Sequence, residues 1–171
     1  MITYNSTFLD NTDIFTPNEI GTYMSGIYSK WERNTYVNYL SKFELPADKR
    51  VKDFSKGMKV KLAFAVALSH KAELLILDEA TNGLDLFAKE KLLKQLQQIN
   101  QLKTAPTLIY ISHHPDEITD IFTHLLLLRE GKVIQSGKKE NLLNEKILTD
   151  FYQEKVEVHR FEQKYFVIPA K

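Results

Sequence analysis

The stretch from Asp53 to Asp85 reads DFSKGMKVKLAFAVALSHKAELLILDEATNGLD, and it decides the fold. Ser55 is a good helix cap, and the apolar residues after it recur at helical spacing, which predicts a helix over roughly Lys56–His70. The apolar run Leu74–Leu77 predicts a strand that is buried on both faces of a parallel sheet. A helix over Leu86–Gln101 and another buried strand over Thr107–Ile111 would complete a β-α-β unit, so the sequence predicts an α/β fold.

The composition narrows the class of protein. The 171 residues suffice for one domain with a substantial core, and the net charge of +1 offers no general attraction to nucleic acid or anionic membranes. The chain has no cysteine, which excludes disulfides and agrees with a reducing cytoplasm. The longest apolar runs, Leu74–Leu77 and Leu125–Leu128, are too short to span a bilayer. The first 13 residues are polar and acidic, unlike a secretory signal.

Two helix starts precede the decisive stretch. Thr16-Pro17-Asn18-Glu19 combines a capping threonine, a proline and a glutamate three residues after the cap, which predicts a helix to about Tyr28. Ser29-Lys30-Trp31-Glu32 predicts a second capping box and a helix to about Phe43, anchored by apolar residues at Trp31, Val37 and Leu40. Residues 1–15 have little periodicity and are predicted to form a loop or a fragment of an element. Together these helices predict a helical lobe.

The second half of the chain predicts further elements. Pro115 should start a helix, and His124–Leu128 and Val133–Gln135 should form two strands joined by a turn at Glu130-Gly131. Lys138-Lys139 is expected to be a solvated helix start, Asn141–Tyr152 a helix, and Glu157–Ile168 one or two strands. We therefore expect three regions: a helical lobe over residues 1–72, a core region over residues 73–155 and a terminal extension over residues 156–171.

Two groups of residues carry candidate chemistry. Asp78 and Glu79 follow a buried strand, at the sheet edge where ligands bind in open α/β folds, so Asp78 is suited to magnesium and Glu79 to activating a water molecule. Ser55 and Gly57 begin a helix, where free N–H groups attract anions. Simpler interpretations remain open for both groups: two solvated loop carboxylates, and an ordinary helix cap.

The order of these motifs resembles the ATP-binding subunit of ATP-binding-cassette (ABC) transporters from about Ile2 to Phe151. FSKGM at Phe54–Met58 is similar to the signature motif, LLILDE at Leu74–Glu79 to Walker B, and NGLD at Asn82–Asp85 to the D-loop. His113 follows a predicted strand, as the switch histidine does, and His114 remains an alternative. The resemblance implies a P-loop NTPase-like parallel sheet core with a helical signature lobe.

The resemblance also implies roles for individual residues. Asp78 would coordinate Mg²⁺, Glu79 would be the catalytic base and His113 would contact the terminal phosphate of ATP. The ATP of the opposite subunit would meet the signature residues Ser55, Lys56, Gly57 and Met58. Asp85 would lie at the interface with that second ATP-binding subunit. A transmembrane permease would be the other partner, and the protein would be cytoplasmic, on the inner face of the membrane. Trp31, Tyr36 and Tyr39 are expected in the lobe core or on a surface for the membrane partner.

The sequence also departs from the family pattern. The 171 residues contain no G-x-x-x-x-G-K-[ST] phosphate loop, because the nearest stretch, Gly131 to Lys139, has one residue too many between its glycines and lies in a predicted hairpin. The chain therefore resembles the C-terminal part of such a subunit, N-terminally truncated and inactive alone. We expect the strand beside Leu74–Leu77 to be missing, which would expose apolar sheet edges. Lys56, Met58 and Ala80 replace the usual glycine, glutamine and proline.

Three functions fit these observations. The first is an ABC-type ATPase subunit that energises transport and lends its signature motif to an intact partner. The second is a non-enzymatic partner or regulatory remnant that docks on a transporter or an intact ATPase. The third is a soluble ABC ATPase not tied to transport, which the near-neutral charge does not support.

Overall fold

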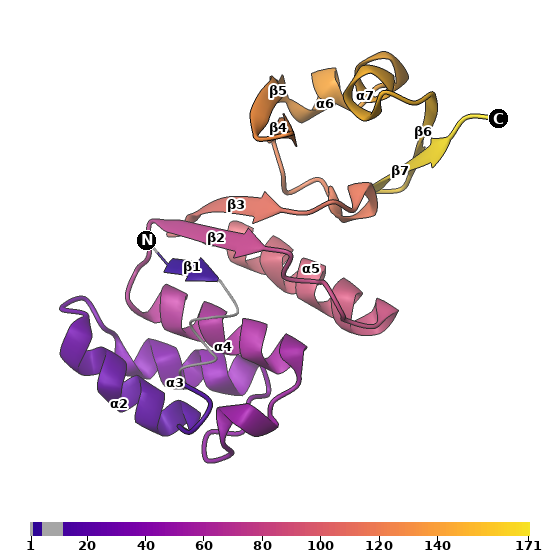
Figure 1. Cartoon of the computed structure of the whole chain (residues 1–171). Helices are drawn as coiled ribbons and strands as arrows, with labels where there is room; N and C mark the ends of the chain where they lie inside the picture. The colour runs from indigo at the N-terminus through magenta and orange to yellow at the C-terminus, as the bar shows by residue number, and fades with distance from the viewer. Residues whose placement is uncertain (1, 5–11) are drawn as a thin grey trace. The chain divides into compact units, whose positions relative to one another are not determined.

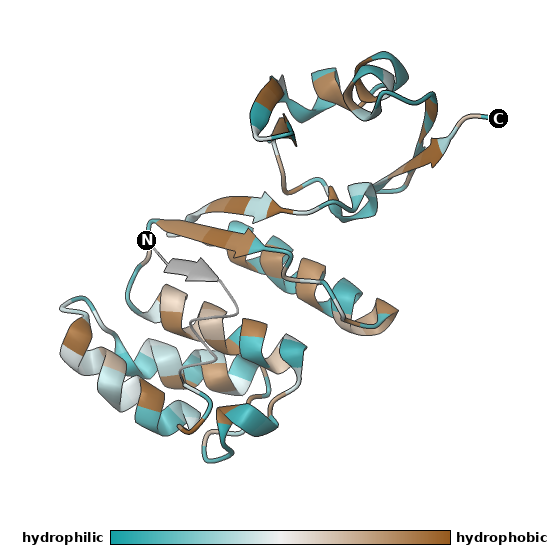
Figure 2. Cartoon of the chain, viewed as in Figure 1, coloured by the Kyte–Doolittle hydropathy of each residue, from teal (hydrophilic) through white to brown (hydrophobic). Residues whose placement is uncertain are grey.

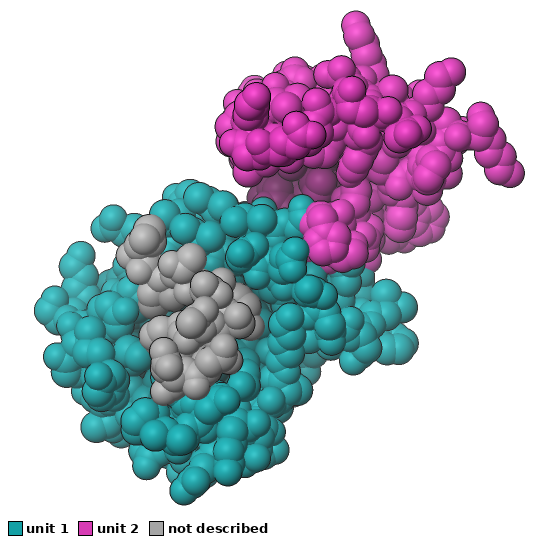
Figure 3. Space-filling view, viewed as in Figure 1, with its two compact units in different colours: residues 1–112 teal, residues 113–171 magenta. Residues whose placement is uncertain are grey.

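The computed structural model describes residues 2–4 and 12–171, and they form two compact units, residues 1–112 and residues 113–171 (Figures 1 and 3). The first unit contains the helical lobe and a parallel sheet. The second contains two hairpins and two short helices. These two compact units differ from the three regions expected from the sequence. The three regions describe functional parts and stay a prediction.

Three helices build the lobe. They are α2 (Pro17–Ile27), α3 (Arg33–Lys42) and α4 (Lys56–Ser69), with a 3-10 turn, η1 (Val51–Asp53), before α4. The predicted capping box of α2 is confirmed, because Thr16 and Glu19 exchange side-chain and backbone hydrogen bonds. Helix α4 is buried on nearly all sides, since it packs against α2 and α3 within the lobe and against α5 and β1 beyond it. It therefore joins the lobe to the sheet.

The second predicted capping box is wrong. Helix α3 begins after Glu32, and no side chain caps it. The Glu32 carboxylate instead lies 2.7 Å from the Nζ atom of Lys71, beyond the end of α4, and accepts a bond from Thr35. Of the expected anchors, Leu40 is buried but Val37 is exposed, and the buried ring of this helix belongs to Tyr36.

The described part of the sheet has the strand order β1-β2-β3, with both pairs parallel. The strands are β1 (Ile2–Tyr4), β2 (Leu74–Asp78) and β3 (Thr107–Ile111), and α5 (Leu86–Asn100) connects β2 to β3. The predicted β-α-β unit and α/β fold are confirmed. The expectation that β2 lacks a neighbour on one side is wrong, because β1 pairs with it.

The expected burial of the strands is only half correct. Figure 2 shows how strongly hydrophobic β2 is, and Leu75 and Leu77 on one face are fully buried. Leu74 and Ile76 on the other face are only partly buried. On that same face of β3, Ile109 and Ile111 are 44% and 46% exposed. The sheet therefore has one covered face and one open face among the described residues.

The second unit is built from short elements. The hairpin of β4 (His124–Arg129) and β5 (Lys132–Lys138) turns at Glu130-Gly131, where both residues have positive φ, as predicted for a tight hairpin turn. Helices α6 (Lys139–Leu142) and α7 (Glu145–Tyr152) follow, and then a second hairpin of β6 (Val156–Phe161) and β7 (Lys164–Pro169).

Three expectations for this unit are corrected. Pro115 begins only a 3-10 turn, η2 (Pro115–Glu117), and not a helix. The helix expected over Asn141–Tyr152 is broken, because Asn144 caps a new helix by accepting a bond from the N–H of Ile147. Lys139 starts a helix as expected, but it is buried rather than solvated.

Candidate functional site

The signature-like segment lies at the start of α4. Ser55 has an extended backbone, and its Oγ atom accepts a hydrogen bond from the N–H of Met58 at 3.3 Å. The N–H groups of Lys56 and Gly57 belong to the first helical turn, where an α-helix provides no acceptor of its own. Ser55 is therefore a helix cap, as the simpler interpretation holds, and the turn that it caps still presents N–H groups to an anion.

Gly57 is not required by the fold. A methyl group in place of a Gly57 hydrogen would lie 3.7 Å from the Cδ2 atom of Leu84, which is an ordinary van der Waals distance. The backbone of Gly57 is helical, and glycine weakens a helix relative to alanine by about 1 kcal/mol. Neither a turn nor a close approach within the described residues explains the glycine. The same measurement places the signature-like segment beside the D-loop-like segment.

The carboxylates Asp78 and Glu79 are exposed where β2 ends. The N–H of Glu79 donates to the carbonyl of Ile111, 3.0 Å away, which ties this end of β2 to the end of β3. Glu79 has φ +45°, in the left-handed region that costs a residue with a side chain roughly 1–2 kcal/mol. Its Oε2 atom accepts a hydrogen bond from the side-chain amide of Asn82 at 3.1 Å. The fold therefore holds the Glu79 backbone and carboxylate in a defined place.

The start of the loop from Ala80 to Asp85 is buried and is bonded to β3. Ala80 and Thr81 are buried, and the hydroxyl of Tyr110 on β3 donates to Thr81 Oγ1 at 3.3 Å. Asp85 caps α5, since its Oδ1 atom accepts from the N–H groups of Phe87 and Ala88, each at 2.9 Å. Asp85 therefore has a structural role as the cap of α5, besides the place at a subunit interface that the resemblance implies.

His113 and His114 begin the second unit, two and three residues after the end of β3. Their rings lie 4.0 Å apart between centroids. Both histidines follow β3 closely, so His113 and His114 are both candidates for the switch position. Within the first unit, the fold brings Gly57 beside Leu84 in the loop before α5, and Asp78 and Glu79 lie where β2 leads into this loop.

Sequence reasoning missed two residues that hold the site. Asn82 lies within the D-loop-like motif, but only its hydrogen bond to Glu79 reveals that it orients the carboxylate. Tyr110 lies on a strand predicted to be buried, and nothing in its spacing indicated that its hydroxyl reaches Thr81. Asparagine is a frequent turn residue whose short side chain forms local hydrogen bonds, and this was the available signal for Asn82.

The carboxylate of Asp78 suits a magnesium ion that is also bound by the phosphates of a nucleotide. Among the described residues, no three histidines or carboxylates form a group that could hold a metal ion by themselves. Mg²⁺ is commonly held by one or two carboxylates together with substrate phosphates, which matches an exposed Asp78 at a strand end. The residues present therefore fit a phosphate-bound magnesium ion.

Comparison with known proteins identifies the family. The family model described as ABC transporter matches residues 2–82. A relative in Lactococcus lactis, an uncharacterized ABC transporter ATP-binding protein named YmeB, is 90% identical over 116 residues, which are 68% of this chain and 45% of that protein. This chain belongs to the family of ABC transporter ATP-binding proteins. The prediction from the motifs is confirmed.

Solved structures agree with the ABC ATPase fold. An ABC transporter assigned to the metal-chelate type, in an inward-facing conformation, matches with a TM-score of 0.74 and 19% identity over 92% of this chain and 68% of that one. The Clostridium perfringens protein cbiO1, part of the ABC transporter complex cbiONQ, matches with a TM-score of 0.64 and 24% identity over 82% of this ABC chain and 58% of that one. The P-loop NTPase-like parallel sheet is confirmed.

The match covers only part of each related protein. This ABC-family chain spans about half the length of the curated relatives it matches. ABC ATPases in general bind ATP with Mg²⁺, and their ATP-binding subunits work with transmembrane components. No helix in the described part of this chain is long and apolar enough to cross a membrane. Of the three candidate functions, the family and the names of the relatives favour a transporter ATP-binding protein.

Proposed function

We propose that this chain supplies the signature, Walker B and switch elements of an ATP site in an ABC transporter, and that it does so in a dimer with a second ATP-binding subunit. The proximity of Gly57 to Leu84, where an added methyl group would lie 3.7 Å from the Leu84 Cδ2 atom, is the observation that carries the proposal. It brings the anion-attracting start of α4 beside the loop that runs from Asp78 and Glu79 at the end of β2 to Asp85. The signature residues and the carboxylates of Asp78 and Glu79 thus belong to one compact unit, and His113 belongs to the second.

The signature segment would bind phosphate groups of an ATP held mainly by the partner subunit. Ser55 offers a hydroxyl, and the turn from Lys56 to Met58 offers N–H groups and the positive end of the α4 dipole. Lys56 adds a positive charge in place of the family's usual glycine. Gly57 leaves room for a phosphate to approach the backbone, which gives a reason for a glycine that the fold itself does not need.

The loop after β2 would serve the hydrolytic reaction. Asp78 would hold Mg²⁺, which supplies charge neutralisation at the phosphates when it is bound with ATP. Glu79 would accept the proton of the attacking water, and Asn82 would keep its carboxylate oriented for that task. His113 would contact the terminal phosphate. This half of the chemistry needs a phosphate loop, which the 171 residues do not contain.

The subunit interface would include the start of α5. Asp85 is followed by Leu86 and Phe87, and the Phe87 side chain is 83% exposed. Large apolar side chains beside a polar loop are typical of surfaces that bind another protein. We assign this surface to the second ATP-binding subunit, because it adjoins the residues that would face the shared ATP.

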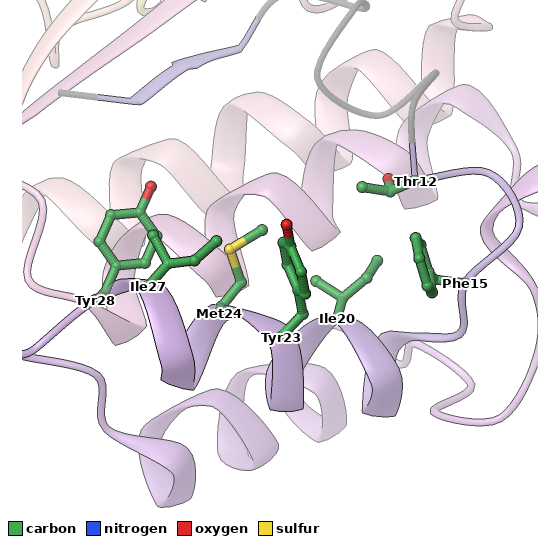
Figure 4. Close-up of a pocket in the computed structure, with 7 residues that line it drawn as sticks. All are labelled: Thr12, Phe15, Ile20, Tyr23, Met24, Ile27 and Tyr28. Carbon is green, nitrogen blue, oxygen red and sulfur yellow. The ribbon is translucent and has the colours of Figure 1, made fainter.

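The membrane partner would dock on the lobe. A hollow of about 330 Å³ lies on α2 and the segment before it. Figure 4 shows its lining, which is mainly aromatic and aliphatic: Thr12, Phe15, Ile20, Tyr23, Met24, Ile27 and Tyr28. Tyr23 and Ile27 are largely exposed, so the hollow fits the apolar side of a helix from a permease. The chain would then lie on the cytoplasmic face of the membrane.

An association assay tests the shared ATP site. The chain is mixed with an ABC ATP-binding subunit that carries a phosphate loop, and sedimentation velocity is measured with and without Mg-ATP. We expect a nucleotide-dependent heterodimer that Ser55→Arg abolishes, because the arginine fills the phosphate approach. The control Ser29→Arg alters an exposed serine outside the site and should have no effect. A folded chain that never associates with the subunit in the presence of Mg-ATP would overturn the proposal.

A cross-linking experiment tests the permease surface. The chain has no cysteine, so Tyr23→Cys provides a unique thiol for a photoactivatable cross-linker. In membranes of the source cells we expect an adduct with a protein that has several membrane spans, and none from Lys94→Cys on α5. Adducts confined to non-membrane proteins, or equal adducts from both sites, would contradict the assignment.

A further inference from the structure

We propose that the C-terminal hairpin β6–β7 positions the His113 segment, so that this extension controls the switch histidine. The hairpin lies beyond residues 2–82, which the family model matches, and beyond the stretch that resembles the family. Within the second unit, β7 packs against η2, the turn that begins two residues after His113. The inference rests on the proposed function, because it assumes the proposed role of His113. The contacts between the hairpin and η2 are present whatever that role is.

Four residues form the contact, and we call them the Tyr165 cluster: Asp120, Lys139, Arg160 and Tyr165. Tyr165 on β7 is buried, with 8% of the residue exposed. The Nζ atom of Lys139 lies 5.7 Å from the centroid of its ring, and the guanidinium carbon of Arg160 lies 5.5 Å from that centroid. Cations within about 6 Å of an aromatic ring are attracted to its face, most strongly when they are buried. The ring therefore holds two cations from different elements.

The same cations hold the chain that follows η2. The buried Nζ atom of Lys139 lies 3.1 Å from the carbonyl oxygen of Thr119 and 3.2 Å from the carboxylate of Asp120, and donates to both. Arg160 on β6 reaches the same Asp120 oxygen at 3.5 Å. Because a buried ammonium group that loses its partners is strongly destabilising, the bonds of Lys139 hold this segment in place.

The turn η2 connects the Tyr165 cluster to the histidines. The N–H of Glu117 donates to the carbonyl of His114 at 3.1 Å, and the N–H of Ile118 donates to that of Pro115 at 3.0 Å. Glu117 is itself fully buried. The backbone of His114 is thus bonded to the turn against which β7 packs, and His113 is the residue before it. Loss of the hairpin would release this turn and the histidine with it.

Nuclear magnetic resonance of the full chain without nucleotide tests the inference. The ring signals of His113 are assigned with His113→Gln, and amide exchange is measured at Glu117 and Ile118. In Tyr165→Ala we expect a shifted or broadened His113 signal and about tenfold faster exchange at both amides. Tyr165→Phe keeps the aromatic face and should restore both observables. Phe166→Ala, on the opposite side of the strand, should leave them unchanged.

Protection of the β4–β5 amides shows whether the unit remains folded. If Tyr165→Ala removes that protection, Arg160→Gln is measured instead, because it deletes only the outer cation. Unchanged His113 signals and unchanged exchange at Glu117 and Ile118, in a folded variant that has lost the Tyr165 cluster, would overturn the inference. Since no nucleotide is present, the result is independent of whether the chain shares an ATP site, which the association assay decides.

Discussion

The Oε2 atom of Glu79 accepts a hydrogen bond from the side-chain amide of Asn82, 3.1 Å away, across a loop in which Glu79 has a left-handed backbone. This contact joins the proposed base to the first residue of the D-loop-like motif. The loop is also bonded to β3 through Ile111 and Tyr110. A change in the D-loop-like segment can therefore alter the position of the Glu79 carboxylate. The Glu79–Asn82 contact can be measured without nucleotide.

The coupling between Glu79 and Asn82 should appear in a double-mutant cycle. Glu79→Ala, Asn82→Ala and the double variant are compared by urea unfolding, and we expect a coupling energy of about 0.5–1 kcal/mol, as for a hydrogen bond to a charged group at the surface. The pair Glu79 and Asn100, at the far end of α5, serves as the control. A coupling energy of zero for the first pair would show that the contact is absent in solution.

The backbone of Glu79 predicts an unusual order of stabilities. At φ +45° an alanine is strained and a glycine is not, so Glu79→Gly should be more stable than Glu79→Ala by about 1 kcal/mol. Denaturant midpoints measure the difference. At Glu90, inside α5, the same pair of substitutions should give the reverse order, because glycine weakens a helix. Equal midpoints for the two Glu79 variants would argue against a left-handed Glu79.

Gly57 should show opposite effects on stability and on function. Gly57→Ala removes a glycine from a helix and makes only an ordinary contact with Leu84, so we expect the unfolding free energy to rise by about 0.5–1 kcal/mol. The added methyl group would meanwhile obstruct phosphate and weaken the Mg-ATP-dependent heterodimer. Both quantities are measured on one variant. A stabilised variant with undiminished association would remove Gly57 from the proposed phosphate site.

The sequence predicted well the elements whose signals are local. The capping box at Thr16 and Glu19, the helix after Ser55 and the turn at Glu130-Gly131 each depend on neighbouring residues, and the structure has them. The motifs also identified the family, because their order along the chain is specific.

Contacts between distant residues could not be predicted in the same way. Glu32 leaves its expected cap because Lys71 lies nearby in space, and Lys139 is buried because Thr119 and Asp120 offer it partners. Strand β1 has only three residues, too few for a periodic pattern, and its pairing with β2 depends on the whole unit. For the site, the motifs named Asp78 and Glu79, but not the left-handed backbone of Glu79.

The packing of α2 against Tyr36 makes two glycines of one helix behave differently. A methyl group at Gly21 would lie 2.6 Å from the Cε1 atom of Tyr36, whose buried ring is held by a 2.8 Å hydrogen bond to the carbonyl of Pro17. Gly21→Ala should therefore destabilise the chain by roughly 1–3 kcal/mol. Gly26→Ala meets nothing within 4 Å and should be neutral or stabilising. Thermal or urea unfolding distinguishes the two, and equal effects would contradict the packing.

His70 should make the lobe sensitive to mild acid. Burial lowers the pKa of His70, whose ring stacks on Tyr28 at 4.1 Å and whose Nε2 atom has no hydrogen-bond partner among the described residues. The unfolded chain therefore binds this proton more readily than the folded chain. The free energy of unfolding is highest above the unfolded pKa of about 6.5 and falls as the pH drops through the folded pKa.

Urea midpoints measured across this range test the His70 prediction. His70→Gln should flatten the acid side of the profile, whereas His124→Gln, a histidine of the second unit, should retain the loss on acidification that belongs to His70. Each variant replaces one histidine with glutamine and leaves the rest of the chain unchanged, so the difference between the two profiles reports on His70. Superimposable profiles would mean that His70 is as readily protonated in the folded chain as in the unfolded one.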